Sequence, residues 1–158
     1  MSFSRVYVGK NVDIRLRNLK ARTGLTPNLL CRVGFCLSLV EPGVPDPELY
    51  SDGQVREFNR YTLTGQWDVL FFSLLRQRLT EDGLDPVTDL ESQFKAHLNR
   101  GVTLLYQRLK SIADISVLLE AQLSVSDGAN GANIGPLRDC SRLLNSKVSS
   151  VRNPTTET

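Results

Sequence analysis

The sequence is short of the residues from which catalytic and metal sites are usually built. It has one histidine, His97, and three cysteines, Cys31, Cys36 and Cys140, none of which form a CxxC pair. No P-loop, nucleophile elbow or HExxH motif is present. We therefore expect no enzyme active site, no bound metal and no cofactor.

Long apolar runs are also missing. No stretch approaches the roughly 18 apolar residues of a membrane-spanning helix, and the opening MSFSRVYVGK has no apolar signal core. An odd number of cysteines does not form a complete disulfide framework. A chain of 158 residues with 41% hydrophobic and 23% charged residues suits one globular domain with a tail. These features favour a reduced, cytoplasmic setting.

Acidic residues are almost absent from the first part of the chain. Residues 1–34 contain one acid, Asp13, against seven basic residues, although the net charge of the whole chain is only +2. Such asymmetry indicates a polyanionic partner, and the alternative is a solvated helix face with no partner. The basic residues are Arg5, Lys10, Arg15, Arg17, Lys20, Arg22 and Arg32.

The same segment begins with a strand and a basic helix. Residues 3–8, FSRVYV, alternate as a short strand does, with Arg5 and Tyr7 on one side. A helix is expected to follow, with Asn11 as its cap. Gly24 supplies the left-handed residue that ends this helix.

A second, apolar helix is expected from Pro27 to about Leu39, with Thr26 as its N-cap. Apolar residues cover most of its circumference, so it must be buried on several sides. Gly34, in its middle, costs about 1 kcal/mol relative to alanine. That cost indicates a close contact with another backbone.

This order of elements is typical of a ribbon-helix-helix unit, in which strands of two chains pair into a ribbon that reads DNA. The second helices of the two chains would then bury each other, which predicts a homo-oligomer. The alternative is an α-hairpin with a frayed first strand. The basic side chains would contact phosphates rather than bases, and the N-terminus of the second helix suits a phosphate. The candidate DNA-binding residues are Arg5, Lys10, Arg15, Arg17, Lys20, Arg22, Thr26 and Asn28.

The rest of the chain predicts further helices and a tail. Residues 58–67 lean towards β structure, a third helix is expected from Val69 to about Thr80, and a long helical pattern starts at Asp89, with a kink near Ser111. From residue 124 the composition is rich in Gly, Asn and Ser. We therefore expect a mainly α fold. It comprises a ribbon-helix-helix-like unit over about 1–40, a helical bundle to 123, and a flexible C-terminal extension over 124–158.

Three side-chain types leave alternatives open. Cys31 and Cys36 would lie about 140° apart on a helix, so they cannot jointly hold a metal. They are most simply small buried hydrophobes, and the alternative is a thiol that relays sulfur. His97 is interpreted as a packed or surface residue, and Trp67 as a core anchor or a protein-contact residue.

Three stretches resemble the DNA sulfur modification protein DndE family: LKARTGLTPNLLCRVGFCLSL, EFNRYTLTGQWD and AHLNRGVTLLYQRLK. The resemblance covers roughly Phe3 to Leu119. It implies a small, mostly helical protein that works in DNA phosphorothioation, where sulfur replaces a non-bridging backbone oxygen. It also implies partners: a cysteine desulfurase, an ATP-using sulfur-transfer protein and an ATPase.

The resemblance implies a non-catalytic DNA-binding subunit, with nicked duplex as a suggested target. Two alternatives remain. One is an adapter that assembles the sulfur-transfer enzymes with little DNA contact. The other is a sulfur-carrying enzyme that uses Cys31 or Cys36.

Overall fold

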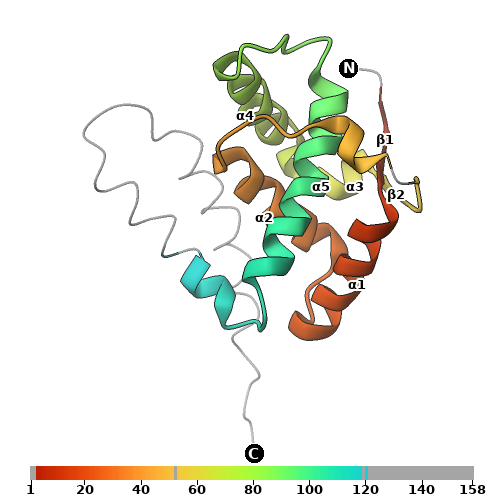
Figure 1. Cartoon of the computed structure of the whole chain (residues 1–158), viewed down its shortest axis with the longest axis vertical. Helices are drawn as coiled ribbons and strands as arrows, with labels where there is room; N and C mark the ends of the chain where they lie inside the picture. Colours follow the sequence, from red (N-terminus) through yellow and green to blue (C-terminus); the bar gives the residue numbers. More distant parts are fainter. Residues whose placement is uncertain (1–2, 52, 119, 121–158) are drawn as a thin grey trace, which may run out of the picture. The chain divides into compact units, whose positions relative to one another are not determined.

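The computed structural model describes residues 3–51, 53–118 and 120, and it shows the predicted mainly α fold (Figure 1). Residues up to Asp114 form one compact unit, and a second unit starts at Ile115. The predicted boundary after residue 123 and the flexible extension over 124–158 lie outside the described residues. The elements are β1 (Arg5–Val8), α1 (Lys10–Thr23), α2 (Pro27–Val40), η1 (Pro47–Tyr50), β2 (Arg56–Asn59), α3 (Arg60–Thr64), η2 (Gly65–Trp67), α4 (Asp68–Glu81) and α5 (Leu90–Arg108).

The ends of α1 and α2 follow local sequence signals, with one exception. Gly24 ends α1 with a φ of 72°, and the Thr26 hydroxyl caps α2 by accepting a hydrogen bond from the Leu29 N–H. However, α1 starts at Lys10, so the predicted cap at Asn11 is wrong. The N–H of the preceding residue, Gly9, donates instead to Asn99 Oδ1 of α5, at 3.2 Å. A contact across the fold therefore sets this helix start.

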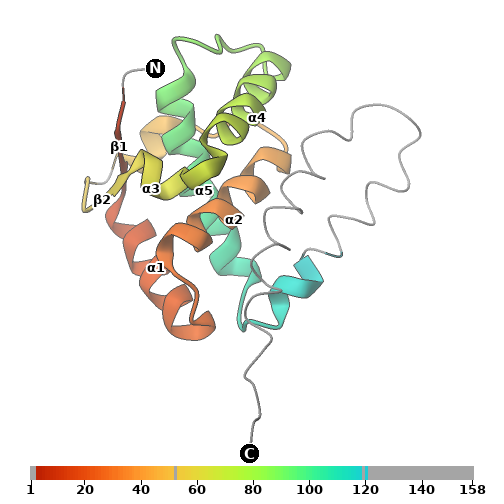
Figure 2. The ribbon, with the colours of Figure 1, turned by 180° about the vertical axis from the view of Figure 1, so that it is seen from behind.

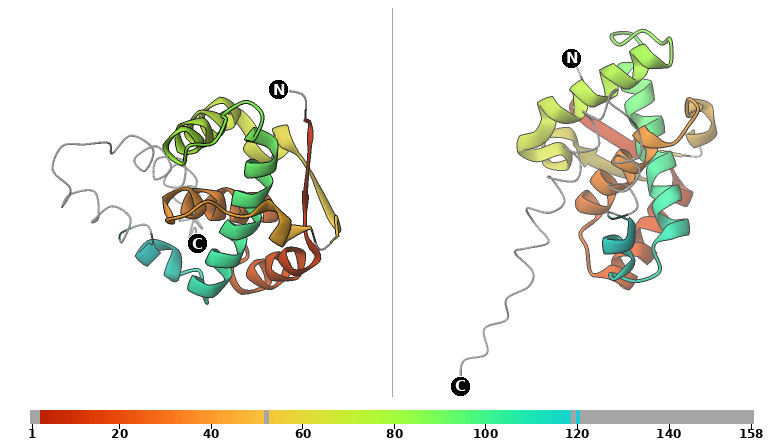
Figure 3. Two further views of the ribbon diagram at one scale, coloured as in Figure 1. Left: turned by 45° about the horizontal axis from the view of Figure 1, so that its top comes forward. Right: turned by 90° about the vertical axis from the view of Figure 1, so that its left-hand side faces the viewer.

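The first strand pairs within its own chain. β1 and β2 lie side by side (Figure 3) and are antiparallel, with Arg5 opposite Asn59. Val6 and Phe58 form the buried face, and Arg5 and Glu57 lie on the exposed face. The inter-chain ribbon that a ribbon-helix-helix unit requires is therefore a wrong prediction for this structure, because residues 56–59 supply the partner strand.

The most buried helix, α2, crosses α5 (Figure 2) at a pair of glycines, Gly34 and Gly101. A Cβ built on Gly34 would lie 2.7 Å from the Gly101 carbonyl carbon. The predicted close approach of two backbones is confirmed, but the partner is α5 of the same chain and not a second copy. The argument that α2 needs a second chain for its burial is therefore removed, and the homo-oligomer stays a prediction without that support.

The later helices match the sequence pattern except at their ends. α4 starts at Asp68, one residue before the expected start at Val69, and the Asp68 carboxylate accepts hydrogen bonds from Arg60 and Thr64. These hydrogen bonds lower the pKa of Asp68, and the bond from Arg60 has the largest effect. Residues 60–64 are helical and not β, because the Asn59 side chain caps them. The long helix α5 ends at Arg108, three residues before the predicted kink near Ser111, and helical backbone resumes at Asp114.

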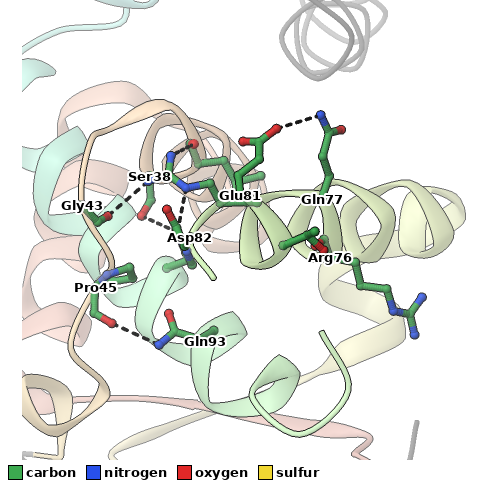
Figure 4. A network of polar contacts seen from close by, with 12 residues as sticks. Ser38, Gly43, Pro45, Arg76, Gln77, Glu81, Asp82 and Gln93 are labelled. Carbon is green, nitrogen blue, oxygen red and sulfur yellow. Dashed lines mark hydrogen bonds and ion pairs between the residues drawn. The ribbon is translucent and has the colours of Figure 1, made fainter. Parts of the chain in front are cut away.

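The far end of α2 is closed by two arginines, and Figure 4 shows the polar contacts around Ser38 and Gly43 at this end. Arg78 Nη1 donates to the Leu39 carbonyl at 2.7 Å, and Arg100 Nη2 donates to the Ser38 carbonyl at 2.6 Å. Both guanidinium groups also donate to the Gly43 carbonyl. The last carbonyls of a helix have no partner within the helix, so these arginines satisfy them and fix the loop that follows.

Candidate nucleic-acid interface

The solvent-exposed surface of α1 is cationic because its only acid is buried. Asp13 is 1% exposed and accepts charge-assisted hydrogen bonds from two arginines. Arg17 Nη2 lies 2.5 Å from Asp13 Oδ2, at the i, i+4 spacing of side chains that meet on a helix, and Arg56 reaches Asp13 from β2. No carboxylate of α1 is therefore left to offset the charge of Lys10 and Lys20.

The lysines of α1 differ from its arginines in their contacts. Lys10 and Lys20 are exposed, and within the described part of the chain their ammonium groups have no hydrogen-bond or ion-pair partner. At 100° per residue, both lie on the side of the helix that carries Asp13. Arg15 and Arg22 lie on the opposite flank. The predicted set is therefore divided into two rows.

The second row lies against α5. Arg15 Nη1 donates to Thr103 Oγ1 at 2.6 Å, and Arg22 Nη2 donates to the Tyr106 hydroxyl at 3.2 Å. The Arg22 guanidinium also lies 4.7 Å from the centre of the Tyr106 ring, within the range of a cation–π contact. Sequence reasoning missed Thr103 and Tyr106, although their i, i+3 spacing places them on one helix face.

Arg5 lies apart from α1, on the exposed face of the sheet. Its Nε is 3.4 Å from Glu57 Oε1, and Tyr7 donates its hydroxyl to the same carboxylate at 2.8 Å. An exposed ion pair of this kind contributes little to stability, so a phosphate can compete with Glu57 for Arg5. Arg5 is nevertheless a weaker candidate than the lysines of α1.

The N-terminus of α2 offers less to an anion than the sequence suggested. Pro27 has no N–H, and the Thr26 hydroxyl already occupies the Leu29 N–H. Among the described residues, the backbone N–H of Asn28 has no acceptor. A helix start that binds phosphate normally presents several such groups, so this end of α2 provides one backbone donor, at Asn28, beside the end of α1.

Arg32 is not among the predicted DNA-binding residues, and its guanidinium group is occupied by contacts with the backbone of α3. Its Nε donates to the Leu63 carbonyl at 2.6 Å, and its Nη2 donates to the Thr62 carbonyl at 3.2 Å. Burial lowers the pKa of this guanidinium. Arg32 is partly buried and joins α2 to α3.

The cysteines of α2 are buried. Cys31 is fully enclosed, and burial raises the pKa of its thiol to about 12. Cys36 is 9% exposed. The thiolate is the reactive form of cysteine, so a thiol that stays protonated at neutral pH is a poor carrier of sulfur. These positions favour the interpretation as small hydrophobic residues, while Cys140 lies outside the described part.

We expect Cys31 to be unreactive in the folded protein. In a Cys140→Ser background, a thiol-specific reagent should label Cys31 only after denaturant is added, because its protonated thiol is enclosed. Labelling is counted by mass spectrometry, with the unfolded protein as the control for full reaction. Fast labelling of Cys31 without denaturant, at the rate of the unfolded chain, would revive the sulfur-relay hypothesis.

The described residues also bear on whether the protein has a metal site or a membrane-spanning helix. Over residues 3–51, 53–118 and 120, no three His, Cys, Asp or Glu side chains lie close enough to hold a metal ion. No single helix of this part has the length and apolarity to cross a membrane, although α1 and α2 reach that length together with a 108° bend between them. Trp67 is half-buried, so its two interpretations stay open.

The fold and this surface define a class: a small, mainly helical protein with a two-stranded sheet and a cationic helix exposed beside it. The model of the family "DNA sulphur modification protein DndE" matches residues 5–113. The chain therefore belongs to the DndE family, as the sequence resemblance indicated. The matched region lies inside the compact unit that ends at Asp114.

A solved structure shows the same fold. The crystal structure of DndE from Escherichia coli B7A, which is described as involved in DNA phosphorothioation modification, superposes with a TM-score of 0.54. The sequences are 22% identical, and the match covers 66% of this chain and 98% of that one. The comparison with curated proteins gives no match.

Proposed function

We propose that this protein is a non-catalytic, DNA-binding subunit of a DNA phosphorothioation complex, and that α1 contacts the phosphates of duplex or nicked DNA. Its family supports the link to DNA sulphur modification, and the Escherichia coli relative supports the type of modification. One observation carries the DNA contact: α1 exposes basic side chains while its only carboxylate is buried and paired.

The chemistry of this surface suits a backbone contact. Lysine and arginine side chains that neutralise phosphates release condensed counterions, which drives binding whatever the base sequence. Lys10 and Lys20 supply charges without a competing partner, and Arg15 and Arg22 add a second row. A protein that prepares DNA for sulfur insertion into its backbone needs a hold on phosphates more than on base edges.

We expect the double change Lys10→Ala and Lys20→Ala to weaken binding to all duplex sequences alike. Each lost phosphate contact should flatten the plot of log K against log salt by about 0.9, so the double variant should lose about 1.8 of slope. The assay is fluorescence anisotropy on intact, nicked and single-stranded DNA over a range of salt.

A matched control is Arg76→Ala. Arg76 is an exposed cation on α4, and Figure 4 shows it directed away from the polar network of that helix. Removing it subtracts one charge without touching α1, so its salt slope should equal that of the unchanged protein. If Arg76→Ala, which removes one charge, loses half as much slope as the double variant, which removes two, then net charge, and not the α1 surface, governs binding.

An adapter function is the second candidate, and one feature favours it. On the α3–α4 segment, Tyr61 is 59% exposed and Val69 is 80% exposed, which suits contact with another protein. An adapter would keep its salt slope in the Lys10 and Lys20 variants and would lose co-purification with the other sulfur-modification proteins when Tyr61 and Val69 become polar.

A further inference from the structure

We infer that Thr103 and Tyr106 of α5 are positioning residues, which hold Arg15 and Arg22 of α1 ready for phosphate contact. This inference rests on the proposed DNA-binding function and extends it to a second helix. Neither residue carries a charge, so a search for basic patches overlooks both.

Three contacts in sequence order show how the two helices meet. Gly9, Arg15 and Arg22 contact Asn99, Thr103 and Tyr106 in turn. The residue numbers of these contacts increase along both helices, so α1 and α5 run along each other in the same direction, as Figure 1 shows. Seven residues separate the arginines, or about 10.5 Å along the helix axis at 1.5 Å per residue. They therefore form a row along the seam between α1 and α5.

The partners of these arginines differ from those of the other arginines near α1. Arg17 is paired with the carboxylate of Asp13, and Arg5 with that of Glu57. Arg15 and Arg22 are held by hydroxyl groups, which fix a guanidinium without neutralising its charge. An arginine kept for an internal ion pair would face a carboxylate, whereas a fixed arginine of full charge suits an external anion.

The guanidinium groups also keep most of their donors. Arginine has five N–H donors in a planar fork. Arg15 uses its Nη1 on Thr103 and Arg22 uses its Nη2 on Tyr106, so each retains donors for the bidentate geometry that phosphates favour. The contact of Arg22 with the Tyr106 ring face, at 4.7 Å, limits the rotation of the guanidinium further.

Holding these side chains in advance has a measurable consequence. A free arginine loses rotamer freedom when it binds a phosphate, and ordering one long side chain weakens binding by about threefold to tenfold. An arginine that α5 has already ordered avoids this loss. Removing Tyr106 should therefore weaken DNA binding by that factor while the number of phosphates contacted stays the same.

The test is a double-mutant cycle. Tyr106→Leu removes the hydroxyl and the ring, and Tyr106→Phe removes the hydroxyl alone. Each is combined with Arg22→Ala, and affinity for a nicked duplex is measured over a range of salt. Tyr61→Leu is the matched control, because Tyr61 lies 5.3 Å from the guanidinium of Arg60, an arginine that is buried against Asp68.

We expect Tyr106→Leu to weaken binding about threefold to tenfold with an unchanged salt slope. Tyr106→Phe should have a smaller effect, and Tyr61→Leu none. In the Arg22→Ala background, Tyr106→Leu should have no further effect. Unfolding by urea should give the same free energy for Tyr106→Phe as for the parent, which separates positioning from a change in stability.

The outcomes distinguish the two proposals. If Arg22→Ala weakens binding and Tyr106→Leu weakens it equally with or without Arg22, the positioning role is wrong and DNA binding stands. The positioning role is also wrong, and DNA binding again stands, if the lysine variants of α1 weaken binding and Arg22→Ala does not. If no change to the cations of α1 affects DNA binding, the proposed function fails first. Replacing Thr103 with valine repeats the cycle for Arg15 and should give the same pattern.

Discussion

Replacing Gly101 with alanine is expected to lower the free energy of unfolding by about 2 kcal/mol or more. A Cβ at this position would meet the backbone of Gly34 and would lie 2.8 Å from the Phe35 nitrogen. Backbone atoms cannot rotate away, so α2 and α5 must separate, and the cost is expected at the upper end of the range for overpacking, about 3 kcal/mol or more. Alanine recovers about 1 kcal/mol in helix propensity, which offsets only part of that cost.

Gly83→Ala is the control for the loss of a glycine as such. Gly83 has a φ of 74° and no atom within 4 Å of an added Cβ, so only backbone strain of about 1–2 kcal/mol opposes the change. Both variants are unfolded with urea and followed by circular dichroism. A Gly101→Ala protein as stable as the parent would contradict the close crossing of α2 and α5.

Lowering the pH from about 7 to about 5 is expected to remove about 2 kcal/mol of stability through His97 alone. Burial, and then repulsion from Arg100 and Arg78, lower the pKa of His97 to about 3, although Asp82 and the Ser38 backbone act in the opposite direction. Between about pH 6.5 and pH 3, His97 is protonated in the unfolded chain, where its pKa is near 6.5, but stays neutral in the folded protein. The contribution is therefore complete above about pH 6.5 and is lost progressively towards pH 3.

His97→Gln tests this dependence because glutamine does not titrate. His97 is buried with Nδ1 only 2.9 Å from the Ser38 hydroxyl, so the variant should be less stable at neutral pH. Between about pH 7 and pH 5, however, its free energy of unfolding should change far less than that of the parent. Equal pH dependence in the two proteins would mean that His97 is not held neutral by its surroundings.

Local signals predicted the helices well and the sheet poorly. Thr26-Pro27 and Gly24 act within one turn of chain, so their meaning does not depend on the rest of the fold. The partner of β1 is different, because β2 has four residues, lies about fifty positions away, and buries fully only Phe58. So short and polar a segment has no clear period, and the sequence pattern therefore points to a second chain as the partner of β1.

The candidate site divides in the same way. The basic residues of α1 can be counted in the sequence. The pair of Asp13 and Arg17 can also be predicted, because it depends only on helical spacing. The role of Arg56 in burying Asp13 and the hydroxyls of α5 beside Arg15 could not be predicted. They depend on which elements are neighbours in space, and helical periodicity places residues on faces without saying what each face meets.

Mapping the DNA contact on the folded protein tests the central claim most directly. Amide resonances of the isotope-labelled protein are followed by NMR while a nicked duplex is added at moderate salt. We expect the largest changes along α1 (Lys10–Thr23), at Asn28, and at Thr103 and Tyr106 of α5. Changes at a saturating concentration of DNA that fall on α3 and α4 and leave α1 unaffected would contradict the account.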